Sequence, residues 1–188
     1  MPLDGLQQIL VATSEEFLDR TRIILDEITP QNINAVCLIG GDERQHSIHN
    51  ALKKVGNVEL VMVHDAVRPF VRLEHIQKCC ESAVKDGGAV LGVPVKDTIK
   101  RVDDRRVIQE TPSRKNLWQT QTPQIFRKDL LVEAYEKAYQ HNFLGTDDAS
   151  LVERLGVNIR MVEGDRSNFK ITYPLDLKLA QLLIEQGI

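Results

Sequence analysis

An acid, an arginine and a small residue follow directly on an apolar run in the segment LVMVHDAVRPF, residues 60–70. Asp65 offers a carboxylate, the kind of ligand that Mg²⁺ takes together with phosphate oxygens. Arg68 offers a planar guanidinium that can bind a phosphate through two parallel hydrogen bonds. The simpler alternative is an ion pair between Asp65 and Arg68 that finishes a strand. The segment therefore predicts either a metal and phosphate site or a structural ion pair.

A second polar group, GGDER, begins at Gly40 and is followed by Ser47 one turn into a predicted helix. Paired glycines let the backbone approach a planar ligand, and the start of a helix offers free N–H groups. Gly41, Asp42 and Ser47 are therefore candidates for contacts with a planar ligand. An ordinary strand-to-helix turn explains the same residues without any ligand.

Two further polar groups lie in the second half of the chain. Thr98 and Arg114 flank a predicted hairpin, and Thr146 precedes a predicted helix that it could simply cap. Lys170 alternates with apolar neighbours in NFKIT, where a lysine is costly unless it pairs with an anion. Trp118 is predicted to lie in a core or an interface. Each of these signals is weak by itself.

Together the groups provide one metal-binding carboxylate, several cations and several small hydroxyls. The cations are Arg68, Arg114 and Lys170, and the hydroxyls are those of Ser47, Thr98 and Thr146. Phosphoryl and nucleotidyl transfer need mainly positioning and charge neutralisation, which such a set supplies. No Ser-His-Asp or Cys-His pairing can be read from the sequence, and its histidines and cysteines lack zinc-site spacing.

Strand-like and helix-like apolar patterns alternate along most of the chain. Strands are predicted at residues 8–13, 35–39, 59–63, 89–95 and 157–162, with Pro94 indicating an edge or a bend. Helices are predicted after an N-cap at Ser14 and at residues 44–55, 72–86, 128–140, 147–155 and 174–186. This alternation predicts an α/β fold whose mostly parallel sheet is covered on both faces. Ligands of such sheets bind beyond the carboxyl ends of the strands, where Asp65 lies.

Residues 96–112 break this pattern, because apolar and charged residues alternate there on both sides of Asp103 and Asp104. Little of the segment is apolar enough to fill a core, so it predicts a two-stranded hairpin that projects from the body. Such an arm has two plausible uses, which are dimerisation and closure over a site.

The composition is that of a globular protein with 188 residues, 42% hydrophobic and 27% charged, and it fits one domain. A net charge of −3 gives no indication of a nucleic-acid partner. The apolar runs are too short to cross a membrane, and residues 1–20 lack the features of a signal peptide. Cys37, Cys79 and Cys80 are odd in number and two are adjacent, so reduced thiols and a cytoplasmic location are expected.

Six blocks of sequence occur in one order along the chain. They are GGDERQHS, VHDAVRPF, VPVKDTIKR, SRKNLWQTQTPQ, FLGTDDASLVE and VEGDRSNFKIT. From about Leu6 onward the chain resembles the 2-C-methyl-D-erythritol 4-phosphate cytidylyltransferase family. The resemblance implies a Rossmann-like nucleotidyltransferase fold in a single domain, residues 1–188, and a homodimer through an arm at residues 96–114. It also implies cytidylyl transfer from CTP to methylerythritol phosphate with Mg²⁺, giving the CDP-alcohol and pyrophosphate for non-mevalonate isoprenoid synthesis.

The resemblance also implies roles for particular residues on the nucleotide side. Gly41, Asp42 and Ser47 would recognise the cytosine. Ala66 would lie beside the ribose. Asp65 would bind the metal and the acceptor.

On the acceptor side, the resemblance places Arg68 and Lys170 near phosphates. Thr98, Arg114 and Thr146 would bind the phosphate and diol of the acceptor, with Thr98 and Arg114 reaching across the dimer. Arg114 and Lys170 would be the catalytic residues, because they would aim the acceptor phosphate at the α-phosphorus. The acceptor phosphate is itself the nucleophile, so no covalent enzyme intermediate is implied.

The chain departs from the family pattern at its start. The family opens with a strand and a glycine-rich loop that carries an arginine, with a lysine nearby, and no such loop precedes Leu6. The expectation is therefore a fragment that lacks the main triphosphate contacts and is inactive or nearly so. The alternatives are a ribitol 5-phosphate cytidylyltransferase and a non-catalytic nucleotide-binding or dimerisation remnant. The blocks VPVKDTIKR and TDDAS favour the methylerythritol enzyme.

Overall fold

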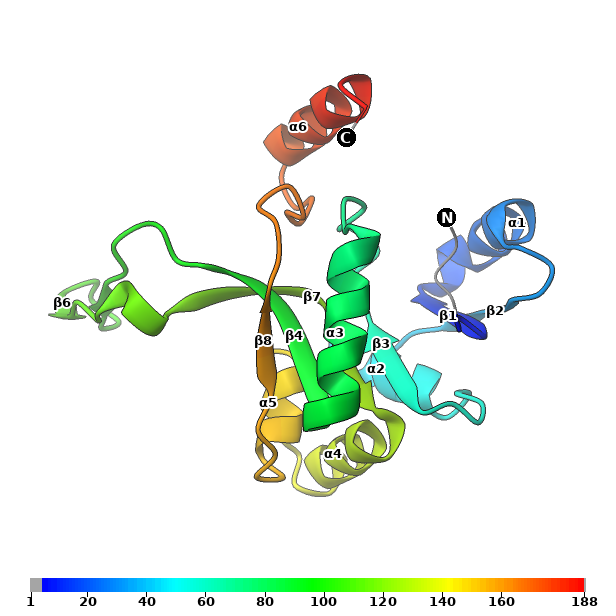
Figure 1. The fold of residues 1–188 in the computed structure, drawn as a ribbon, viewed down its shortest axis with the longest axis horizontal. Coiled ribbons are helices and arrows are strands. Elements are labelled where there is room, and N and C mark those ends of the chain that lie inside the picture. The colour runs from blue at the N-terminus through cyan, green and yellow to red at the C-terminus, as the bar shows by residue number, and fades with distance from the viewer. Residues whose placement is uncertain (1–4, 188) are drawn as a thin grey trace. The chain divides into compact units, whose positions relative to one another are not determined.

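The computed structural model describes residues 5–187 and divides into two compact units (Figure 1). The first unit comprises the described residues up to Val63 together with Phe126–Ile159. The second unit comprises His64–Ile125 and the described residues from Arg160 onward. The candidate site residues are distributed over both units, so each unit is described separately.

The first unit begins with two parallel strands that are joined by a helix. Strand β1 (Gln8–Thr13) pairs in parallel with β2 (Asn34–Ile39), and α1 (Leu18–Ile28) lies between them in the chain and packs on both. A parallel pair needs a crossover connection, and α1 provides it. The strands and the helix predicted for this part of the chain are confirmed. The predicted N-cap at Ser14 is wrong for this helix. Ser14 precedes a short 3₁₀ turn, Glu15–Phe17, and its side chain makes no capping hydrogen bond.

The rest of the first unit holds α2 (Arg44–Leu52), β3 (Leu60–Val63), α4 (Lys128–Gln140) and α5 (Asp148–Glu153). Helix α4 has the predicted bounds and packs on α5 and β3. Its buried residues recur with the spacing of one helix face: Leu131, Ala134, Tyr135 and Ala138.

The cap of α5 differs from the prediction. Asp147, and not Thr146, is the N-cap, and its carboxylate accepts from the backbone N–H of Ser150 at 2.9 Å. Aspartate caps helices at least as well as threonine does. Thr146 and Asp147 are adjacent in the chain, so the sequence allowed either of them to be the N-cap. Thr146 therefore lies outside the helix, with an exposed side chain.

The larger sheet has the strand order β3-β7-β4-β8, and β4, β8 and most of β7 belong to the second unit. Strand β4 (Gly88–Pro94) pairs in parallel with β8 (Arg160–Glu163), and α3 (Leu73–Asp86) packs against both. The edge position predicted from Pro94 is wrong, since β4 lies between β7 and β8. Proline is tolerated because it is the last residue of the strand, where the ladder ends.

Strand β7 (Trp118–Arg127) was not predicted, because WQTQTPQIFR lacks an apolar pattern. Gln121, Thr122 and Gln124 are nevertheless buried, at 6%, 5% and 2% exposure. Polar side chains can occupy a core when they are hydrogen-bonded, and Gln121 donates to the Asp165 carbonyl at 2.9 Å. These three polar residues of the strand therefore belong to the interior.

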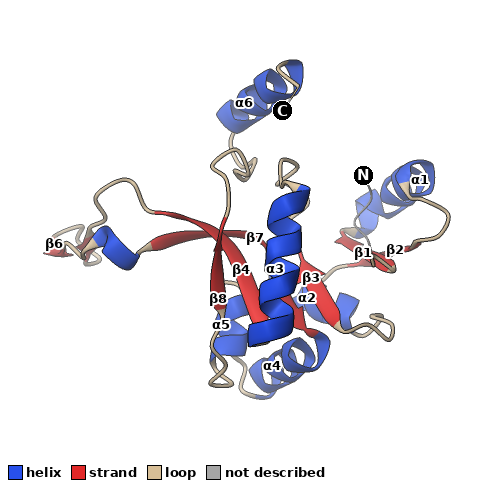
Figure 2. Ribbon diagram, in the orientation of Figure 1, coloured by secondary structure: helices blue, strands red, loops and turns tan. Residues whose placement is uncertain are grey.

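The predicted hairpin is confirmed. Strands β5 (Arg101–Val102) and β6 (Ile108–Glu110) pair antiparallel, and Figure 2 shows their arm extending away from β4 and β7. The Asp103 carboxylate holds the turn by accepting from the backbone N–H groups of Arg105 and Val107 at 3.0 and 2.9 Å. Aspartate side chains commonly stabilise turns by accepting from the backbone a few residues further on.

The chain closes with α6 (Pro174–Glu185), which starts at the proline as predicted. None of the helices in residues 5–187 is long and apolar enough to cross a membrane. Cys37, Cys79 and Cys80 are free thiols, as predicted, and burial raises the pKa of Cys79 to about 12.

Gly92 in β4 should tolerate no side chain. A Cβ there would lie 2.8 Å from the Gln119 carbonyl oxygen and 2.5 Å from Cε of Met161. Because backbone cannot easily move away, Gly92→Ala should lower the free energy of unfolding by about 1–3 kcal/mol, measured by urea denaturation. Gly56→Ala is the control, since its Cβ would meet only the Gln8 amide oxygen at 3.6 Å. Equal stability of the two variants would contradict the packing described for β4.

Candidate active site

The turn after β3 places one carboxylate beside two cations. The backbone N–H of Arg68 donates to the Asp65 carbonyl at 3.0 Å and closes the turn. Nζ of Lys170 lies 3.1 Å from Oδ2 of Asp65, and Nε of Arg68 lies 3.9 Å from the same oxygen. The structure thus brings these three predicted site residues together within the second unit. Lys170 was expected to pair with an anion, and in the structure that anion is the Asp65 carboxylate.

His64 and Thr122 hold the backbone of this turn. The Asp65 N–H donates to Oγ1 of Thr122 at 3.0 Å, and that hydroxyl lies 3.0 Å from Nδ1 of His64. Nε2 of His64 lies 3.0 Å from the Arg68 carbonyl oxygen. A consistent pattern has the hydroxyl donating to Nδ1 and Nε2–H donating to the carbonyl. Burial lowers the pKa of His64, so the ring is neutral at pH 7, as this pattern requires.

Sequence reasoning assigned no role to His64 or Thr122, although both lie in the quoted blocks VHDAVRPF and SRKNLWQTQTPQ. Their function becomes visible only when β7 is recognised as a strand that passes beside the turn. A histidine directly before the candidate carboxylate was the available signal.

A second segment, residues 165–171, is hydrogen-bonded to this turn. Nη1 of Arg68 donates to the Asn168 carbonyl at 2.8 Å, and the Ile171 N–H donates to the Val67 carbonyl at 2.9 Å. Asn168 is fully buried and donates from Nδ2 to the Thr122 carbonyl at 2.9 Å. These bonds fix the backbone on both sides of Lys170. Its side chain stays 45% exposed and can therefore reach a ligand.

The Arg68 guanidinium is only partly satisfied within this arrangement. Its Nε is buried and has no hydrogen-bond partner in the part of the chain that the structure describes. Burial lowers the pKa of Arg68, and the Asp65 carboxylate opposes that shift. A buried donor without a partner is uncommon in proteins, and an anionic ligand would satisfy it.

Asp65 fits the requirements of a Mg²⁺ ion that is shared with a nucleotide. Mg²⁺ commonly takes one or two carboxylates and completes its shell with phosphate oxygens and water. Residues 5–187 contain no group of three or more His, Cys, Asp or Glu side chains that could hold a metal by themselves. A metal at Asp65 would therefore depend on a phosphate ligand.

Asp165 anchors the start of the segment that carries Lys170. Its carboxylate accepts from the backbone N–H of Ser167 at 2.7 Å and lies 3.3 Å from Nη2 of Arg72. The hydrogen bonds from Ser167 lower the pKa of Asp165 from its ordinary value of 3.8.

This shift predicts a pH-dependent contribution to stability. The folded pKa lies below the unfolded value of 3.8, so the stabilisation is present above pH 3.8 and is lost as the pH falls through the folded pKa. Asp165→Asn should lower the urea midpoint at neutral pH, and the difference from wild type should shrink below pH 3.8. Urea denaturation of both proteins across this range is the measurement. A difference that stays constant down to the lowest pH would contradict the anchoring role.

The predicted base-binding loop belongs to the first unit and is held by α2. The Gly41 N–H donates to Oγ of Ser47 at 3.0 Å, and Asn50 donates from Nδ2 to the Gly40 carbonyl at 3.2 Å. A Cβ at Gly41 would lie 2.5 Å from Cβ of His46, so the close approach of loop and helix requires a glycine. Asp42 is exposed at the tip of the loop.

The remaining predicted site residues are exposed to solvent. Ala66 is exposed within the turn of the second unit, and Thr98 and Arg114 lie at the base of the arm. Arg114 donates from Nη1 to the Lys96 carbonyl. Thr146 is exposed in the first unit. Their ligand contacts remain predictions.

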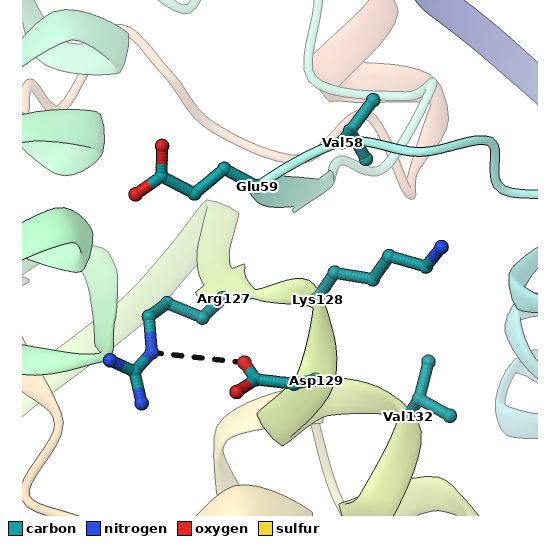
Figure 3. A pocket seen from close by; sticks show the side chains of 6 residues that line it. All are labelled: Val58, Glu59, Arg127, Lys128, Asp129 and Val132. Carbon is teal, nitrogen blue, oxygen red and sulfur yellow. Dashed lines mark ion pairs between the residues drawn. The ribbon is translucent and has the colours of Figure 1, made fainter.

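Figure 3 shows an open cavity of about 440 Å³ in the first unit, lined by Val58, Glu59, Arg127, Lys128, Asp129 and Val132. Arg127 pairs there with Asp129 at 3.7 Å, and Lys128 donates to the Gly56 carbonyl at 2.7 Å. None of the predicted site residues lines this cavity. Its cations already have partners, so it offers little to an anionic substrate.

Comparisons with known sequences agree with the blocks found in this chain. Residues 3–186 match the protein family described as IspD, 2-C-methyl-D-erythritol 4-phosphate cytidylyltransferase. A protein of that name from Caldanaerobacter subterraneus subsp. tengcongensis is 42% identical over 98% of this chain and 82% of its own length. Another from Geobacillus thermodenitrificans is 48% identical over 79% of this chain. That alignment spans only 65% of the Geobacillus protein, which is less than two thirds of its length.

Solved structures resemble the fold over nearly all of the chain. The crystal structure of 4-diphosphocytidyl-2C-methyl-D-erythritol synthase from Anaerococcus prevotii has a TM-score of 0.88 at 30% identity, covering 97% of this chain and 81% of that one. The 2-C-methyl-D-erythritol 4-phosphate cytidylyltransferase from Thermus thermophilus gives 0.79 at 35% identity, covering 95% and 82%. The predicted α/β nucleotidyltransferase fold with a mostly parallel sheet is confirmed.

Proposed function

The chain belongs to the 2-C-methyl-D-erythritol 4-phosphate cytidylyltransferase family, and from this premise we propose that it serves cytidylyl transfer from CTP to methylerythritol phosphate. The products are the CDP-alcohol and pyrophosphate, within non-mevalonate isoprenoid biosynthesis. The observation that carries the proposal is the Asp65 carboxylate held between Lys170 and Arg68, at 3.1 and 3.9 Å.

The proposed reaction is a displacement at the α-phosphorus of CTP. An oxygen of the acceptor phosphate forms the new bond to phosphorus, and the bond to the β-phosphate oxygen breaks, so pyrophosphate leaves with the electron pair. Asp65 would hold Mg²⁺, which would supply positive charge against the phosphates. Lys170 and Arg114 orient the acceptor phosphate towards the α-phosphorus, and Arg68 binds a phosphate. The exposed Lys170 side chain, fixed at its backbone, supports this role.

The other proposed roles concern recognition. Gly41, Asp42 and Ser47 bind the cytosine, and the hydrogen bond from the Gly41 N–H to Oγ of Ser47, which holds the loop on α2, supports this. Ala66 leaves room for the ribose, which agrees with its exposed position in the turn. Thr146 binds the diol of the acceptor.

The arm is proposed to serve assembly. Residues 96–114 form the homodimer contact, and Thr98 and Arg114 bind the acceptor of the partner subunit's site. The exposed apolar side chains of the arm, Ile99, Val102, Val107 and Ile108, support an interface there. Residues 1–188 act as one nucleotidyltransferase domain in the cytoplasm, with small-molecule substrates and no nucleic-acid or membrane partner.

The test is pyrophosphate release by the 188-residue chain with CTP and Mg²⁺, and methylerythritol phosphate or ribitol 5-phosphate as separate acceptors. Calorimetry with each ligand accompanies it. Release with methylerythritol phosphate alone supports the proposal. Release with ribitol phosphate alone favours the ribitol enzyme, and CTP binding without release from either acceptor favours a nucleotide-binding remnant.

A further inference from the structure

Helix α2 makes side-chain contacts with two separate segments of the first unit. Ser47 and Asn50 hold the loop at Gly40 and Gly41, as described above. The first residues of the same helix, Arg44 and Gln45, instead contact the segment that precedes α5. One rigid helix therefore carries contacts to the proposed base-binding loop and to the segment around Thr146.

The side-chain amide of Gln45 hydrogen-bonds the backbone just before Thr146 through both its nitrogen and its oxygen. Its Nε2 donates to the Phe143 carbonyl at 2.9 Å, and its Oε1 accepts from the Gly145 N–H at 2.9 Å. The residue is only 8% exposed. A buried amide with both functions satisfied fixes the backbone that it spans, and no apolar side chain could replace it without leaving two backbone groups unpaired.

The chain is also fixed just beyond Thr146. Nη2 of Arg44 donates to the Asp148 carboxylate at 2.8 Å, and the Tyr135 hydroxyl donates to its other oxygen. Asp148 is fully buried. Thr146 is thus an exposed residue whose neighbours on both sides are tied to α2.

Gly145 makes the close approach possible. A Cβ at this position would lie 2.6 Å from Oγ of Ser150 and 2.6 Å from Cδ2 of Leu151, both on α5. The Gly145 backbone is therefore pressed against α5 and bonded to Gln45 at once. This leaves the segment little freedom in which Thr146 could change position.

We propose that Gln45 is a positioning residue that fixes the Thr146 hydroxyl for the acceptor, on the same helix that fixes the loop for the base. The inference rests on the proposed function, because it takes the ligands of Thr146 and of the loop from there. Gln45 touches neither ligand in this arrangement; it acts through the backbone at residues 143–145. Its loss should weaken acceptor binding while leaving CTP binding intact.

The experiment compares wild type with Gln45→Met and Gln45→Glu. Methionine has a similar volume without the amide, whereas glutamate keeps the acceptor for the Gly145 N–H. Gln140→Met, at the exposed end of α4, is the matched control. Affinities for CTP and for methylerythritol phosphate in the presence of a non-hydrolysable CTP analogue are measured by calorimetry. Exchange of the Gly145 amide hydrogen is followed by NMR.

We expect Gln45→Met to bind the acceptor about 10-fold more weakly, with CTP affinity within about twofold of wild type. Gly145 amide exchange should be faster in Gln45→Met and close to wild type in Gln45→Glu, which should also recover part of the acceptor affinity. The control should match wild type throughout.

Other outcomes separate the two proposals. If wild type binds both ligands and Gln45→Met binds the acceptor equally well, the positioning role is overturned alone. An equal loss of both affinities together with a lower melting temperature also overturns it, because the residue would then be merely structural. A wild type that binds neither ligand overturns the proposed function, and the positioning role falls with it.

Discussion

In a full-length version of the enzyme, Asp65→Asn is expected to reduce kcat/KM for pyrophosphate release by about 10²–10³-fold or more. Asparagine keeps the shape of the side chain but removes the negative charge that lies 3.1 Å from Lys170. The same change removes the carboxylate that is proposed to hold Mg²⁺, so the ion pair with Lys170 and the anchor of the metal are lost together. Steady-state kinetics and the Mg²⁺ dependence of CTP binding both measure the effect, and the second needs no turnover.

Asp26→Asn is the matched control, since Asp26 is an exposed acid on α1. It should leave kinetics and Mg²⁺ dependence as in wild type. Turnover and Mg²⁺-dependent CTP binding that survive in Asp65→Asn would remove this carboxylate from the mechanism. Circular dichroism of the variant separates loss of function from loss of the fold.

Asp148→Ala should lower the free energy of unfolding by about 3 kcal/mol. The carboxylate is fully buried and binds both Arg44, at 2.8 Å, and the Tyr135 hydroxyl. Truncation leaves the buried hydroxyl without this acceptor and removes the carboxylate that Arg44, which is 39% exposed, binds at 2.8 Å. Urea denaturation followed by circular dichroism measures the change.

A surface acid provides the comparison. Asp19 pairs with Arg22 at 3.2 Å, but its side chain is 91% exposed. Asp19→Ala should therefore change the free energy of unfolding by no more than about 0.5 kcal/mol. If Asp148→Ala behaves like Asp19→Ala, the buried cluster contributes little and the account of the Thr146 segment weakens as well.

The elements that could be predicted from the sequence are those with a complete local signal. Helix α4 was predicted to the residue because its apolar positions recur on one face and polar residues bound it. The arm was recognisable because apolar and charged residues alternate around the Asp103 turn. The position of Asp65 followed from a general property of α/β sheets, in which the ends of strands carry the ligand.

The features that sequence reasoning missed depend on partners distant in the chain. Strand β7 looks polar, and only the burial of Gln121 and Gln124 against other segments explains its place in the sheet. Gln45 similarly lies in an ordinary polar run, and its role rests on a segment about one hundred residues away. The N-cap of α5 was missed by one residue, since adjacent Thr146 and Asp147 are both good caps.

The bond between Arg68 and the Asn168 carbonyl joins residues 100 positions apart, and β4 pairs with β8 over a comparable distance in the chain. Contacts of this kind require closure of a long loop before they stabilise anything, so they form late in folding. During synthesis at about 5–20 residues per second, Asp65 is added to the chain roughly 5–20 s before Lys170. In that interval the nascent chain carries Asp65 and Arg68 without Lys170, and the second cation of the site is supplied only afterwards.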